Sequence, residues 1–165
     1  MYAQRNDSTG PRTRQGYNRP VPTRLRMGLV MRRDMDFGDM GDIEGALRAD
    51  GVSLAPMSTG DASLISAGVT VLATATAADI TGGMVKGLVV PGGLLTDEAG
   101  VALVRELLML ARANGVPVLA FADGVALAAE VFETAAEAPG AVFRGDKVAL
   151  VNDRAELSAV IATIP

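Results

Sequence analysis

The chain has 165 residues, of which 49% are hydrophobic and 21% are charged, enough for one domain with a proper core. It contains no cysteine and no histidine, which excludes disulfides, thiol nucleophiles and the commonest general base and transition-metal ligand. We therefore predict no metal site and no cofactor. The net charge of −4 divides unevenly: residues 1–26 hold six arginines and one aspartate and sum to +5, which leaves −9 for the rest.

Residues 1–24 are predicted to form a basic arm, separate from an α/β body at residues 25–165. The arm has almost no large aliphatic side chains, so we expect it to be disordered or to become ordered only on a partner. Its arginines and two interleaved tyrosines suit an acidic protein or a nucleic acid; the alternatives are a solvated tail and a mis-assigned start codon. The candidate partner-binding residues are Arg5, Arg12, Arg14, Arg19, Arg24 and Arg26.

The sequence also bears on the cellular location of the protein and on the kinds of partner it binds. No stretch approaches the ~20 apolar residues of a membrane-spanning helix, and the polar N-terminus lacks the apolar region of a signal peptide. We therefore expect a cytoplasmic protein without a membrane partner. The acidic body argues against a broad nucleic-acid-binding face, so only the arm would serve that role.

Segments typical of strands and of helices alternate along the body. Apolar strands are predicted at residues 25–31, 52–56, 87–91, 116–121 and 147–151, with an edge strand or hairpin at 69–75. Helices are predicted at 42–50, 96–114, 125–132 and 155–164, with a helical turn at 77–84. Continuous apolar strands separated by helices indicate a parallel sheet covered on both faces, with ligands beyond the carboxyl ends of its strands.

The most informative segment is 116–130, VPVLAFADGVALAAE. It combines a buried strand, a sharp turn at Ala122, Asp123 and Gly124, and a helix, which is the form of a nucleophile elbow. The position of the nucleophile holds Ala122. The pattern therefore indicates a site that is kept while its usual chemistry is removed.

The order of GLVVPGG, a long helix and NGVPVLAFADGVALAAE resembles the ThiJ/PfpI family of the class I glutamine amidotransferase-like superfamily, over roughly residues 25–151. Members show a strand ending in PGG, a helix, and A-[IV]-C-x-G at the elbow, which puts Ala122 on the family's cysteine. The resemblance implies a flavodoxin-like three-layer α/β/α sandwich with a mainly parallel sheet. It also implies self-association, and we expect a homodimer.

The chain departs from the family at each reactive position. The family's acid is usually a glutamate just after the first strand, but RRDMDFGDMGD puts Gly38 near that place, with Asp36 or Asp39 as stand-ins. The residue after the cysteine is often histidine in protease-like members and is Asp123 here. Thiol chemistry is therefore excluded, whatever the alignment.

An oxyanion-type pocket without a nucleophile remains. The resemblance implies that backbone N–H groups of Gly92, Gly93 and Asp123 point into it, in front of the following helix, which would suit a small anion. For the Asp123 carboxylate we favour N-capping of that helix over a catalytic role.

The loop after the first strand is the densest acidic cluster, and two interpretations stay open. With Asp123 it could hold a hard cation, although its spacing does not match an EF-hand loop. The favoured interpretation is a solvated loop in which Asp42 caps the first helix. Its acidic residues are Asp34, Asp36, Asp39, Asp42 and Glu44.

Three hypotheses for function follow. The first is a catalytically silent ThiJ/PfpI-like domain that serves as a binding or assembly protein. The second is a carboxylate-dependent hydratase or isomerase on a small carbonyl compound, with Asp123 and Asp36 or Asp39 as acid and base. The third is nucleic-acid binding through the arm.

Overall fold

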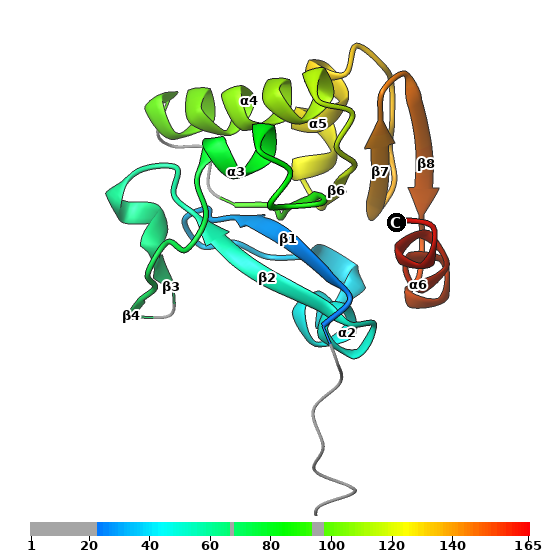
Figure 1. Cartoon of the computed structure of the whole chain (residues 1–165), viewed down its shortest axis with the longest axis horizontal. Coiled ribbons are helices and arrows are strands. Elements are labelled where there is room, and N and C mark those ends of the chain that lie inside the picture. Colours follow the sequence, from blue (N-terminus) through cyan, green and yellow to red (C-terminus); the bar gives the residue numbers. More distant parts are fainter. Residues whose placement is uncertain (1–22, 67, 94–97) are drawn as a thin grey trace, which may run out of the picture.

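The computed structural model describes residues 23–66, 68–93 and 98–165. Its centre is a six-stranded sheet with the strand order β2-β1-β5-β6-β7-β8 (Figure 1). The first four strands in this order are parallel, and β7 and β8 are antiparallel to their neighbours. The strands are β1 (Leu25–Val30), β2 (Val52–Met57), β5 (Leu88–Val90), β6 (Val118–Phe121), β7 (Gly140–Arg144) and β8 (Lys147–Val151).

Helices cover both faces of the sheet, so two apolar cores form. The helices α3 (Ala77–Thr81), α4 (Glu98–Ala113) and α5 (Gly124–Val131) pack on one face, where Leu108 of α4 is fully buried. The helices α2 (Ile43–Ala49) and α6 (Arg154–Ala162) pack on the other face, where Leu47 and Leu157 are fully buried. This arrangement confirms the predicted three-layer α/β/α sandwich with a mainly parallel sheet. In particular, β5 and β6 are parallel neighbours, as expected.

One strand was missed by the predictions, and one predicted segment is confirmed in part. The strand β7 was not predicted, yet it pairs with both β6 and β8 and buries Phe143 completely. The segment predicted as an edge strand or hairpin at 69–75 contributes β4 (Val69–Thr70) to a hairpin with β3 (Ile65–Ser66), which lies outside the main sheet and begins before the predicted segment. Two 3₁₀ helices, η1 (Gly38–Met40) and η2 (Asp61–Leu64), complete the set of elements among the described residues.

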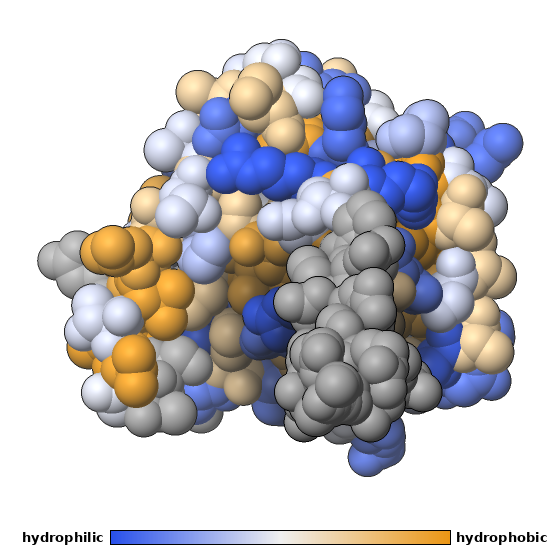
Figure 2. Space-filling view, turned by 60° about the horizontal axis from the view of Figure 1, so that its bottom comes forward, coloured by the Kyte–Doolittle hydropathy of each residue, from blue (hydrophilic) through white to orange (hydrophobic). Residues whose placement is uncertain are grey.

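The β3–β4 hairpin carries apolar side chains into solvent. Ile65, Val69 and Leu72 are 52%, 64% and 79% exposed. Figure 2 shows apolar atoms gathered at the left of the molecule, where this hairpin lies. The hairpin therefore forms an exposed apolar patch of the described surface that could contact another molecule.

The arginines predicted to bind a partner fall into two groups. Arg5, Arg12, Arg14 and Arg19 lie outside the described residues. Arg24 donates to the carbonyl oxygens of Ile164 and Ile161 at 2.7 and 2.6 Å, where its charge also complements the C-terminus of α6. Arg26 lies in β1 and donates to the Thr74 carbonyl at 2.9 Å. Both side chains thus already hold parts of the body together, and a partner contact for them stays a prediction.

Within the ranges that the structure describes, no helix has both the length and the apolar character that crossing a bilayer requires.

Candidate functional site

The predicted elbow lies at the carboxyl edge of the sheet, between β6 and α5. Ala122 has a φ of +52°, in the left-handed region that L-residues occupy at a cost of about 1–2 kcal/mol. Its N–H donates to the Pro139 carbonyl at 3.1 Å, and its own carbonyl accepts from the Val125 N–H at 3.2 Å. The glycine at 124 permits close packing, because a Cβ there would lie 2.7 Å from the Val90 carbonyl oxygen. The strained turn of an elbow is therefore present around a methyl group.

The position opposite Ala122 also lacks a functional group. A Cβ built on Gly38 would lie 3.4 Å from the Ala122 Cβ, so Gly38 stands beside the elbow, where the resemblance places the family's acid. A Cβ built on Gly92 would lie only 2.8 Å from the same methyl group. The three facing positions therefore carry two glycines and one alanine. Neither a nucleophile nor its acidic partner is present at the point of the elbow.

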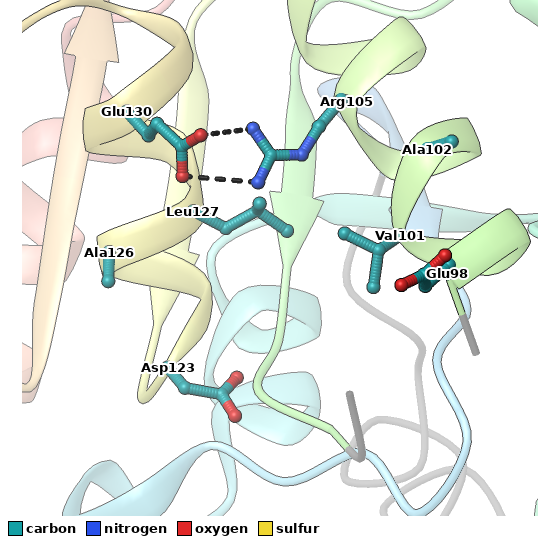
Figure 3. Close-up of a pocket in the computed structure, with 8 residues that line it drawn as sticks. All are labelled: Glu98, Val101, Ala102, Arg105, Asp123, Ala126, Leu127 and Glu130. Atoms are coloured by element: carbon teal, nitrogen blue, oxygen red, sulfur yellow. Dashed lines mark hydrogen bonds and ion pairs between the residues drawn. The ribbon is translucent and has the colours of Figure 1, made fainter. Parts of the chain in front are cut away.

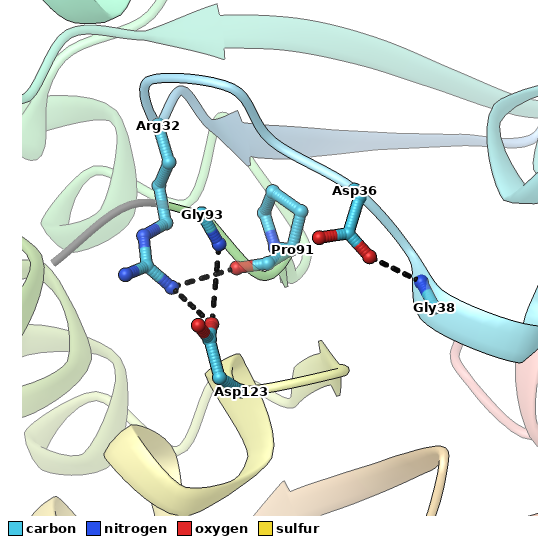
Figure 4. Close-up of polar contacts among 6 residues, drawn as sticks. All are labelled: Arg32, Asp36, Gly38, Pro91, Gly93 and Asp123. Carbon is cyan, nitrogen blue, oxygen red and sulfur yellow. Dashed lines mark hydrogen bonds and ion pairs between the residues drawn. The ribbon is translucent and has the colours of Figure 1, made fainter.

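The prediction that Asp123 caps α5 is wrong. Although Asp123 is the N-cap residue, its side chain makes no hydrogen bond to the helix. Instead its Oδ1 accepts from the Gly93 N–H at 3.1 Å and from Arg32 Nη1 at 3.0 Å (Figure 4). The carboxylate turns toward the loop after β5 because a backbone donor and a guanidinium there compete successfully with the N–H groups of the helix.

Arg32 is the residue of this site that sequence reasoning missed. It lies two residues after the end of β1, and its side chain is 4% exposed against 48% for that of Asp123. Its Nη1 also donates to the Pro91 carbonyl at 3.0 Å, whereas its buried Nη2 has no hydrogen-bond partner among the described residues. An arginine after an apolar strand, facing a predicted acidic elbow, was the available signal. The side chain joins three loops and neutralises the charge of Asp123.

Two of the three backbone donors predicted at the elbow, the N–H groups of Gly92 and Gly93, already have acceptors. The Gly92 N–H donates to the Asp36 carbonyl at 2.9 Å, the Asp36 N–H donates back to the Gly92 carbonyl at 3.0 Å, and the Gly93 N–H is bonded to Asp123. Binding of an external anion at Gly92, Gly93 and Asp123 stays a prediction, and at Gly92 and Gly93 it would require the anion to displace these internal acceptors.

The acidic loop after β1 is largely engaged in local turns. The Asp36 Oδ1 accepts from the Gly38 N–H at 2.6 Å, and Asp39 lies exposed in η1. Asp42 caps α2 by accepting from the Gly45 N–H at 2.9 Å, as predicted. Over the described part of the chain, no three carboxylates come together in an arrangement that could hold a metal ion. The structure thus places Asp36 and Asp123 in the two loops around Gly92, each with its own hydrogen-bond partners.

A pocket of about 530 Å³ opens beside the elbow, between α4 and α5 (Figure 3). Arg105 of α4 and Glu130 of α5 form a bidentate ion pair across it, with Nη2 and Oε2 at 3.1 Å. The hydrogen bonds from Arg105 hold the pKa of the Glu130 carboxyl below its ordinary value. The pocket is lined by Val101, Ala102, Ala126 and Leu127, and by the charged residues Glu98, Arg105, Asp123 and Glu130.

Comparison with known proteins places the fold. No protein-family model matches the sequence, and no match is found among curated proteins. A similar solved structure is titled "Crystal structure of the putative protease I from Bacteroides thetaiotaomicron". The two chains superpose with a TM-score of 0.59 over 86% of this chain and 100% of that chain, at 12% sequence identity. At this identity the likeness establishes the fold alone, and that fold is the flavodoxin-like α/β/α sandwich expected from the sequence.

Proposed function

We propose that this protein is a catalytically silent ThiJ/PfpI-like domain that acts by binding or assembly. The observation that carries the proposal is the left-handed elbow at Ala122, kept at its energetic cost around a methyl group that faces Gly38. The neighbouring Asp123 is bonded to Arg32 and Gly93. The groups around the elbow therefore serve the structure rather than activate a nucleophile.

The exposed hairpin supports self-association as the form that assembly takes. A two-stranded hairpin is marginal on its own, and Ile65, Val69 and Leu72 leave its apolar surface uncovered. A second copy of the chain would bury these side chains about a two-fold axis. Homodimerisation and a cytoplasmic location remain predictions of this proposal.

The silent elbow is tested by restoring its thiol. We expect the wild-type protein to show no thiol-dependent hydrolase, deglycase or glyoxalase activity. In Ala122→Cys, the thiol lies at the N-terminus of α5, so iodoacetamide at pH 7 should alkylate it about three to ten times faster than an ordinary thiol. The matched control is Ala159→Cys, an exposed position on α6 in a chain with no other cysteine. A thiol at 122 that reacts like the control, or is inaccessible, contradicts the elbow.

The carboxylate-dependent hydratase or isomerase has weaker support. Its general acid and base would be Asp123 with Asp36 or Asp39, but Arg32 neutralises Asp123, and Asp36 is bonded to the Gly38 N–H. Turnover of small carbonyl compounds that disappears in Asp123→Asn would favour this alternative over a silent domain. Nucleic-acid binding by the arm depends mainly on arginines outside the described residues and stays a prediction.

A further inference from the structure

The pocket between α4 and α5 has an apolar middle and charged ends. Val101 and Leu127 line its middle, and the short side chains of Ala102 and Ala126 leave it open (Figure 3). The Arg105–Glu130 pair stands at one end, and the carboxylates of Asp123 and Glu98 stand away from that pair. A volume of about 530 Å³ lies within the range of small-ligand sites.

The charged side chains of this pocket carry more negative than positive charge. Arg105 is the cation among its lining residues, and both of its terminal nitrogens are bonded to Glu130. Glu98 makes no ion pair with another described residue. The hydrogen bonds of the Asp123 carboxylate to described residues both use Oδ1, so Oδ2 has no partner among them. With Arg32 behind Asp123, the described residues contribute three carboxylates and two guanidinium groups, a net charge of −1.

We propose that this pocket binds a small organic monocation, an ammonium or guanidinium group on a short aliphatic chain. The cationic group lies between Glu98 and Asp123 Oδ2, where it neutralises the site. The aliphatic chain lies on Val101 and Leu127, which cannot hydrogen-bond and suit methylene groups. The inference goes beyond the proposed function, because it concerns a ligand of the α4–α5 groove and holds whether or not the elbow is silent.

The test is an NMR titration of the full-length protein with n-butylammonium, followed on the amides of α4 and α5. We expect saturable binding with a dissociation constant of about 1–10 mM, as for a fragment of this size. Butan-1-ol, which has the same chain without the charge, should bind at least about tenfold more weakly, and butyrate should not bind. Equal binding of the alcohol, or preferential binding of butyrate, would overturn the proposal.

Two variants place the ligand, each with a matched control. Glu98→Gln should weaken butylammonium binding about three- to tenfold, whereas Glu156→Gln, the first-turn glutamate of α6, should leave it unchanged. Ala102→Leu should block the pocket, whereas Ala159→Leu on α6 should not. Because all four positions are exposed, these variants should fold normally. Equal effects of a variant and its control would contradict the site.

The arginines of the chain's own arm are the competing occupant. Replacing Arg5, Arg12, Arg14 and Arg19 together by glutamine should leave butylammonium binding unchanged if the pocket takes a free ligand. Tighter binding in that variant would show that arm side chains fill the pocket and would overturn the assignment to a free small molecule.

Discussion

Replacing Arg32 with methionine tests how the carboxyl edge of the sheet is held together. The guanidinium donates to the Pro91 carbonyl and to Asp123, both at 3.0 Å, from a side chain that is 4% exposed. Methionine keeps most of the apolar stem but removes both bonds. The buried Pro91 carbonyl then loses its side-chain donor, which costs about 1–3 kcal/mol.

Loss of the ion pair with Asp123 contributes less to the destabilisation than loss of a fully buried ion pair would. Its side chain is 48% exposed, so water can solvate the carboxylate when Arg32 is gone, and the ion pair contributes at most about 1 kcal/mol. Removing the unpartnered Arg32 Nη2 offsets part of the loss. Together these effects predict that Arg32→Met lowers the free energy of unfolding by about 2 kcal/mol.

Urea denaturation followed by far-UV circular dichroism measures this loss. Fluorescence is unsuitable, since the chain has no tryptophan and its two tyrosines lie at positions 2 and 17. Arg33→Met changes an exposed neighbour and should alter stability by less than about 0.5 kcal/mol. If Arg32→Met is as stable as Arg33→Met and the slope of the unfolding free energy against urea concentration is the same, the buried guanidinium does not hold the three loops together. That result would refute the reasoning.

Three further outcomes can be measured. Ala122→Gly should raise the free energy of unfolding by about 0.5 kcal/mol, because relief of left-handed strain outweighs the added chain entropy. Ala102→Gly, at an exposed position of α4, should lower it by about 1 kcal/mol, and changes of the same sign for the two variants in urea titrations would contradict the strain. The pKa of Glu130 is lowered by its bond to Arg105, so the ion pair stabilises the protein fully at pH values above the ordinary glutamate pKa, and this contribution is lost as the pH falls through the lowered pKa. The stability difference between wild type and Glu130→Gln should therefore vanish in acid, and a difference that does not depend on pH would argue against the pair. In sedimentation equilibrium, Leu72→Asp should shift a dimer toward monomer and Leu150→Asp on β8 should not, while a wild-type monomer at high concentration would rule out the dimer.

Local patterns in the sequence predicted most of the framework. The strands β5 and β6 are continuous apolar runs that are buried on both faces, and β1 departs from this pattern only at the half-buried Arg26, so the pattern and the burial agree there. The edge strand β2 is only partly buried. The segment 116–130 predicted the turn at Ala122 because strand, small residues and helix follow one another within 15 residues. Composition alone excluded thiol and imidazole chemistry, since no fold can supply a residue that the chain lacks.

Tertiary structure decided the features that depend on residues far apart in the chain. The short strand β7 carries little signal of its own and exists because β6 and β8 provide hydrogen-bonding edges on both sides. The side chain of Asp123 was expected to cap its own helix, but Arg32, 91 residues earlier, and Gly93, 30 residues earlier, supply better donors once parallel strands bring their loops together. A sequence pattern indicates hydrogen-bond partners only among residues that are close together in the chain. Only the fold shows that the Asp123 carboxylate accepts from a buried guanidinium and makes no hydrogen bond to the N–H groups of its own helix.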